Sequence, residues 1–80
     1  MAREADQIAQ DYSAMSDSVE LITAVIAGDQ MADDLAVDRQ ACVDRNVEHL
    51  EIMVAKDDWG SESMTATNAA IKAGNGYTAS

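Results

Sequence analysis

The sequence predicts an all-α fold, with three helices packed into a compact domain and the longest helix at the N-terminus. Three observations support this prediction. The 80 residues include no Pro and many Ala, the residue with the highest helix propensity. Apolar residues recur at steps of three and four, which is the period of one helix face. Two glycine-containing stretches separate three such segments, and no repeat or change in composition divides the chain, so residues 1–80 are expected to form a single domain.

The first helix is expected at about residues 2–27. Its apolar residues alternate at steps of three and four, as in a coiled-coil heptad. This row comprises Ala5, Ile8, Tyr12, Met15, Val19, Ile22 and Ile26. Leu21 and Val25 widen the row near its end to an arc of about 160°, so this end is expected to contact two neighbouring helices. Gly28 follows at a position typical of a helix C-terminus.

The second helix is expected at about residues 38–56, with Asp38 as its N-cap and Asp33 or Asp34 as the alternative cap. Two adjacent stripes run along it. The core stripe comprises Val43, Val47, Leu50 and Val54, and the stripe beside it comprises Cys42, Asn46, His49 and Met53. Lys56 falls in the last expected turn, where a cation suits the helix dipole. The connector before this helix contains three apolar residues that are expected to fold back against the helices, namely Met31, Leu35 and Val37.

The third helix is expected at about residues 61–73. Gly60 supplies the turn before it, and Ser61 or Ser63 can cap it. Its apolar stripe is thin, consisting of Met64, Thr67 and Ile71. The run Gly74-Asn75-Gly76 is a strong helix terminator, and Tyr77 is expected to pack back across the helix end.

Stability is the main physical problem for a chain of this size. A domain this short buries only roughly 60% of the surface that its unfolded chain exposes. Cys42 is the single cysteine, so no disulfide can form within the chain, and a reducing compartment is favoured. Well-packed helices or association with other chains are therefore the expected sources of stability.

The net charge of −10 restricts the function classes. Such a surface repels nucleic-acid phosphates and anionic membranes, whereas it suits a basic protein partner. The charged start of the chain does not resemble a signal peptide, and no apolar run approaches the length of a membrane span. We therefore expect a soluble protein that binds neither nucleic acid nor membranes.

Metal binding and catalysis have little support in the sequence. Cys42, His49 and Met53 share a helix face, but one face cannot surround a metal ion. We expect Cys42 and Met53 to pack as apolar side chains, and Asn46 and His49 to form hydrogen bonds at the edge of the core. No nucleophile, base and acid can be grouped around the single His. The sequence thus predicts no enzyme, no cofactor and no metal site.

The acidic residues of the second connector, the segment between the second and third expected helices, are a further candidate for cation binding. Asp57, Asp58 and Glu62 lack the alternating oxygen ligands of an EF-hand loop, which leaves loose cation binding as the alternative. The simpler interpretation is that Asp58 or a nearby Ser caps the third helix.

Protein contacts are the remaining possibility. Ile52 lies roughly opposite the core stripe of its helix, which suggests a partner contact. Ile8, Tyr12 and Met15 on the first helix are candidates for contacts between chains. Trp59 is expected to fold inward, and an exposed anchor for a partner is the alternative, because Trp is enriched in binding hot spots.

The region from Cys42 to Tyr77 resembles a group of short acidic proteins of marine bacteriophages, including those of cyanobacteria, which have no assigned activity. The resemblance rests on a run with Asn46, His49, Leu50 and Met53, the acidic turn with Trp, residues 68–71 and the Gly-rich tail with Tyr. It covers under half of the chain and excludes the first helix. It implies a phage origin but transfers no functional residue.

Two functions fit these observations. The first is a non-enzymatic structural or adaptor protein that assembles with its own copies or within a larger complex, such as a phage particle. The alternative is an acidic decoy that inhibits a nucleic-acid-binding protein of the host, although scattered carboxylates match phosphate rows poorly. The expected location is the host cytoplasm or the phage particle.

Overall fold

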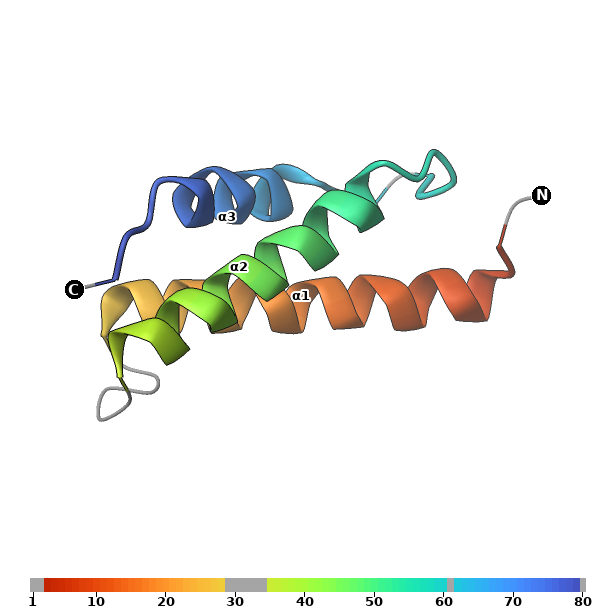
Figure 1. Cartoon of the computed structure of the whole chain (residues 1–80). Coiled ribbons are helices and arrows are strands. Elements are labelled where there is room, and N and C mark those ends of the chain that lie inside the picture. The colour runs from red at the N-terminus through yellow and green to blue at the C-terminus, as the bar shows by residue number, and fades with distance from the viewer. Residues whose placement is uncertain (1–2, 29–34, 61, 80) are drawn as a thin grey trace.

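The computed structural model describes residues 3–28, 35–60 and 62–79, which form three α-helices (Figure 1). Helix α1 spans Ala5–Ala27, α2 spans Ala36–Val54 and α3 spans Thr65–Asn75. α1 is the longest with 23 residues, and each helix packs against the other two. The predicted all-α fold with three helices is therefore confirmed.

The start of α1 lies later than predicted, and its end lies where predicted. Residue 2 is outside the described part of the chain, and Glu4 has an extended backbone with φ −65° and ψ 154°. The first helical hydrogen bond runs from the Ile8 amide to the Glu4 carbonyl, at 2.9 Å. At the other end Gly28 adopts φ 83°, the left-handed conformation that glycine reaches without a steric penalty.

The boundaries of α2 are both two residues earlier than predicted. Leu35 occupies the N-cap position, and its carbonyl accepts hydrogen bonds from the amides of Asp38 and Arg39. The prediction that Asp38 is the cap is wrong: it lies in the first turn, where its negative charge still favours the helix dipole. The alternative caps, Asp33 and Asp34, lie outside the described residues. Lys56 follows the helix instead of ending it.

Helix α3 also differs from its prediction at both ends. Its N-cap is Met64, so the helix starts four residues later than expected. Ser63 lies just before this position, and its hydroxyl accepts a hydrogen bond from the Thr65 amide at 3.3 Å. Ser61 lies outside the described residues. The helix ends within the expected run Gly74-Asn75-Gly76, with Gly76 as its C-cap, but two residues later than predicted, because it continues through Gly74 to Asn75.

The packing of Gly74 against α2 explains why α3 continues through this residue. It is buried, and a Cβ added to it would lie 2.3 Å from Cγ2 of Val47 and 3.3 Å from Cγ1 of Val43. Only a residue without a side chain allows α3 to approach α2 so closely. This glycine therefore serves helix packing, and Tyr77 beyond it packs against the core as predicted.

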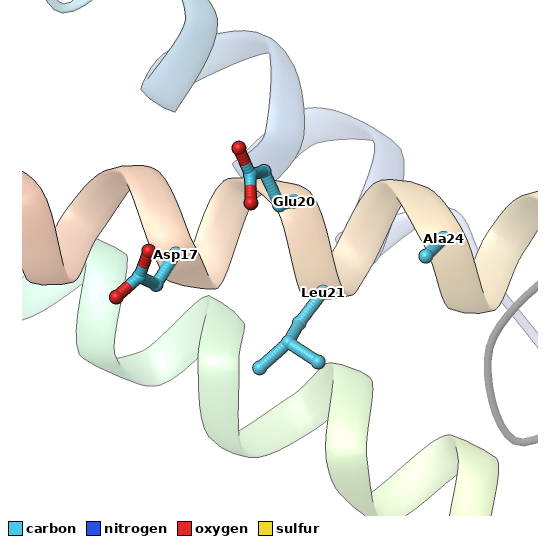
Figure 2. A pocket seen from close by; sticks show the side chains of 4 residues that line it. All are labelled: Asp17, Glu20, Leu21 and Ala24. Carbon is cyan, nitrogen blue, oxygen red and sulfur yellow. The ribbon is translucent and has the colours of Figure 1, made fainter.

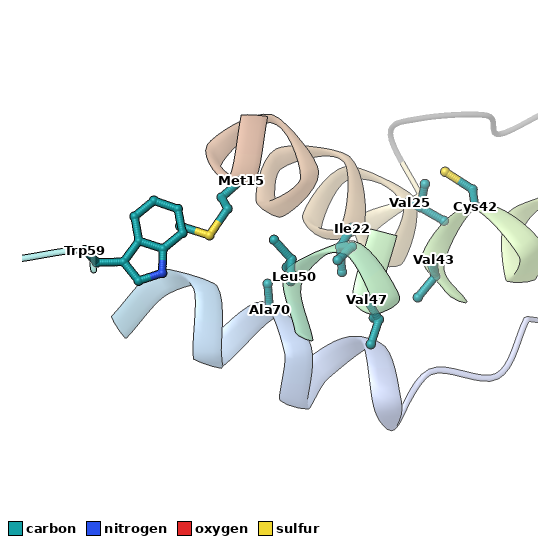
Figure 3. Packing of buried hydrophobic residues seen from close by; sticks show 9 residues of the cluster. All are labelled: Met15, Ile22, Val25, Cys42, Val43, Val47, Leu50, Trp59 and Ala70. Carbon is teal, nitrogen blue, oxygen red and sulfur yellow. The ribbon is translucent and has the colours of Figure 1, made fainter. Parts of the chain in front are cut away.

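The core lies where the three helices meet (Figure 3). Its fully buried large side chains are Met15, Ile22, Val43 and Leu50. The stripe predicted on α2 is confirmed for its first three positions, and its last, Val54, is half-buried. On α1, Val25 joins the core, whereas Leu21 and Ile26 lie outside it, so the expected wide stripe is only partly correct.

Candidate functional site

The five residues predicted to contact a partner are placed very differently by the fold. Ile52 is 57% exposed and faces solvent. Met15 and Trp59 are buried, and Ile8 and Tyr12 are half-buried and pack against the core. From Ile8 to Ile22 the α1 row thus packs within the chain, and the burial of Met15 and Trp59 leaves almost none of either side chain exposed to a partner in this fold. The expectation that Trp59 folds inward is confirmed.

Trp59 closes the end of the bundle where α2 ends and α3 begins. Its indole N–H donates a hydrogen bond to the Met53 carbonyl at 2.9 Å. The Tyr12 ring packs against it edge-on, with centroids 6.0 Å apart and planes at 64°. The Tyr12 hydroxyl donates to the Ser63 carbonyl at 2.8 Å. The second connector is therefore fixed to α1 at two points.

Arg3 holds the same end together through a cluster that we call the Arg3 clasp, formed by Arg3, Asp11, Asp58 and Trp59. The guanidinium forms a two-pronged ion pair with Asp58, and its Nη1 lies 2.6 Å from Oδ2 of Asp11. The Arg3 amide also donates to Oδ2 of Asp58 at 2.9 Å. The guanidinium carbon lies 4.2 Å from the Trp59 ring centroid, a cation–π distance.

The Arg3 clasp also explains the shifted pKa values in the protein. Hydrogen bonds from the Arg3 side chain hold the pKa of Asp58 well below its ordinary value, and they lower the pKa of Asp11 in the same direction. Asp58 in turn raises the pKa of Arg3. The prediction that Asp58 caps the third helix is wrong, because this carboxylate is bound to Arg3.

The role of Arg3 was not predicted from the sequence. Its main partner lies 55 residues away, so no local pattern reveals the contact. The available signal is that Arg3 is the single Lys or Arg in the first 38 residues, ahead of a helix with several acids.

We expect the Arg3→Ala variant to have a lower Tm and a less tightly packed Trp59 side chain. Its Trp emission should shift to longer wavelength and become more accessible to acrylamide, and Trp59 is the single Trp, so the change is unambiguous. Because the folded-state pKa of Asp58 is lowered, the ion pair stabilises the fold above pH 3.8 and is lost as pH falls towards the lowered pKa. The Tm difference should therefore be full near neutral pH and shrink in acid.

The control for the Arg3 clasp is Arg45→Ala, which removes the same charge from an exposed position on α2. This control should leave the Trp emission unchanged. Equal emission spectra for Arg3→Ala and the wild type would contradict the clasp.

The side chains of the stripe with Cys42 and His49 pack and form hydrogen bonds within the fold. Cys42 is buried, and the Asn46 side chain donates to its carbonyl at 2.8 Å. His49 Nδ1 lies 2.8 Å from the Ser18 hydroxyl, which links α2 to α1. Asn46 and His49 thus form hydrogen bonds as predicted. Ser18 is only 5% exposed, so a substrate cannot reach its hydroxyl in this conformation.

Residues 3–28, 35–60 and 62–79 contain no metal-binding group of side chains and no membrane-spanning helix. Nowhere in these ranges do three His, Cys, Asp or Glu side chains come together in a way that could hold a metal ion. None of the helices there has the length and apolarity needed to cross a bilayer.

Exposed apolar residues occur where α1 ends and α2 begins. These two helix ends lie at the same end of the molecule (Figure 1). We call Ile26, Leu35 and Val37 the apolar end; they are 39%, 70% and 68% exposed. Leu35 and Val37 were expected to fold back against the helices, and this prediction is wrong. Met31, the third residue of that prediction, lies outside the described residues.

A second surface feature lies on the outward side of α1. Four residues spaced at i, i+3, i+4 and i+7 line an open hollow of about 380 Å³, namely Asp17, Glu20, Leu21 and Ala24 (Figure 2). We call this hollow the α1 groove. The two acids are exposed and the two apolar residues are half-buried, so the groove has an apolar floor and an acidic rim.

Comparison with known proteins adds no relative: no family model, no curated protein and no solved structure matches this chain.

Proposed function

We propose that this protein acts without catalysis, by assembling with other protein chains through the apolar end. The observation that carries the proposal is the exposure of Leu35 and Val37, about two-thirds or more of each side chain. These side chains add little to the monomer, because apolar groups stabilise a fold only when they leave water.

The arrangement of the apolar end supports this proposal. Single exposed apolar residues are ordinary, but three of the four large ones in the described part of the chain lie at one end. The fourth, Ile52, is exposed on α2. It lies fifteen positions beyond Val37, which is about 22 Å along the axis and about 60° around it. A partner that covers the apolar end can therefore extend along the same side of α2.

The charge of the protein determines how such an assembly responds to salt. With a net charge of −10, two copies repel each other at low ionic strength. Salt screens this repulsion while apolar burial persists, so association between copies should strengthen as salt is added. A structural or adaptor role in a phage particle is the form of this proposal that the resemblance of residues 42–77 supports.

The test is sedimentation velocity of the purified chain over a wide concentration range, at ionic strengths of about 0.05 and 0.5 M. We expect concentration-dependent association that is stronger at the higher salt. The double variant Leu35→Gln/Val37→Gln keeps the net charge and should lose it.

Ala41→Gln is the matched control for this test, since it adds the same side chain to an exposed position one turn further along α2. It should associate like the wild type. A wild-type chain that stays monomeric under all conditions, and that recovers no protein from purified phage particles, would contradict the proposed function.

The decoy function has one specific observation in its favour. α1 carries Asp6, Asp11, Asp17 and Glu20 and no Lys or Arg. However, Asp11 is bound to Arg3, and the other three extend over about 21 Å of helix. Duplex DNA carries one charge per roughly 1.7 Å, so α1 is a sparse imitation of it. Assembly remains the better-supported function.

A further inference from the structure

We propose that the α1 groove binds a basic segment of a partner protein. A Lys or Arg side chain of that segment lays its aliphatic stem on Leu21 and Ala24, and its cation lies between Asp17 and Glu20. This inference deepens the proposed function and rests on it, because it names the chemistry of a partner for a protein that acts by binding.

The geometry separates the α1 groove from the core. At about 100° per residue, Ile22 lies about 140° around the helix from Asp17. Ile22 is 1% exposed and belongs to the core, so Asp17, Glu20 and Ala24 face away from it, whereas Leu21 lies about 40° around the helix from the buried Val25 and borders the core. In Figure 2, Glu20 extends from one edge of α1, and Asp17 and Leu21 extend from the other edge, where α2 is drawn. Leu21 and Ala24 are half-buried, and a partner can contact their exposed parts without any opening of the bundle.

The charges of the α1 groove are not neutralised by the described residues. No hydrogen bond or ion pair joins Asp17 or Glu20 to any of them, and α1 itself contains no base. Arg3 is bound to Asp11 and Asp58 near the N-terminal end of α1. An incoming cation therefore meets two carboxylates one helical turn apart that have no competing partner in residues 3–28, 35–60 and 62–79.

The combination of floor and rim selects the chemistry of the partner. A small metal ion or a free cation uses only the carboxylates and leaves the apolar floor exposed. Long basic side chains match both parts, because they bury their methylene stems along apolar surface and keep the charged end at its edge. The net charge of −10 adds long-range attraction for a basic segment.

The experiment measures binding of a fluorescent amphipathic helical peptide with Lys on one face and Leu on the other. The test variant is Asp17→Asn/Glu20→Gln, which removes two charges and keeps side-chain size. The control is Glu48→Gln/Glu51→Gln, which changes the net charge equally, at the same spacing, on exposed positions of α2. The groove variant should weaken binding at least about tenfold and the control less than about twofold.

The Leu21→Ser variant distinguishes binding that uses the apolar floor from attraction by charge alone. We expect it to weaken peptide binding several-fold, since the floor then loses its apolar side chain. The four acids of the charge variants are exposed, so the far-UV circular dichroism and Tm of these variants should match the wild type. Leu21 is half-buried, so the affinity of Leu21→Ser is measured well below its own Tm.

Three outcomes would contradict binding at the α1 groove: no measurable peptide binding, equal weakening by the two charge variants, or full affinity in Leu21→Ser. Each leaves the proposed function intact if sedimentation still shows association that depends on Leu35 and Val37. Salt distinguishes the two surfaces as well. Peptide binding in the groove should weaken at high ionic strength, whereas assembly through the apolar end should not.

Discussion

Replacing Leu50 with Ala should lower the free energy of unfolding by about 3 kcal/mol. Leu50 is 0% exposed, and Figure 3 places it between Ile22 of α1 and Ala70 of α3. Truncation removes apolar contacts to both neighbouring helices and leaves a cavity that three packed helices cannot easily close. For a chain of 80 residues the total stability is about 4–12 kcal/mol, so the loss is a large share of it.

The control for Leu50 lies two residues further along the same helix. Ile52→Ala removes a side chain of equal size from a position that is 57% exposed, and it should change stability by less than about 0.5 kcal/mol. Urea unfolding followed by far-UV circular dichroism measures both variants. Similar losses at the two positions would show that α2 does not face the core as described.

Gly74→Ala should destabilise the protein by about 1–3 kcal/mol, although Ala is the better helix former by about 1 kcal/mol. The added Cβ would lie 2.3 Å from Cγ2 of Val47, far inside van der Waals contact. Val47 is β-branched and sits on a helix, so its side chain has essentially one rotamer and cannot swing away. Either α3 moves away from α2 or the core around Val47 shifts.

Gly76→Ala is the matched control for Gly74. A Cβ at Gly76 would meet its nearest atoms at 3.7 and 3.8 Å, which are ordinary contacts. This variant should be neutral or slightly stabilising in the same urea experiment. Truncating Val47 to Ala should reduce the additional loss caused by Gly74→Ala, because the clashing methyl group is gone. A Gly74→Ala protein as stable as the wild type would contradict the close approach of the helices.

The core was predictable because its residues recur along the sequence with the period of one helix face. Val43, Val47 and Leu50 recur at steps of four and three, and all three are buried. Ser18 was not recognised as a buried residue. Its position, three after Met15 and four before Ile22, was the available signal, because residues at those spacings share a helix face.

Features that depend on partners distant in the sequence were not predictable. Gly74 resembles a terminator because Asn75 and Gly76 follow it, and only the position of Val47 on another helix reveals its packing role. Arg3 is linked to Asp58 across 55 residues.

Hydrophobicity alone misled the prediction for the first connector. Leu35 and Val37 were assigned to the interior because they are apolar, yet the fold leaves both exposed. The misassigned residues are the ones that now carry the proposed function.

One comparison tests most directly whether these exposed side chains serve binding and not folding. The urea unfolding midpoint of the Leu35→Gln/Val37→Gln variant is measured at a protein concentration where the wild type is monomeric, beside its sedimentation at high concentration. Our account predicts an unchanged midpoint together with loss of association. A midpoint that falls while association persists would contradict it, because the two residues would then belong to the fold.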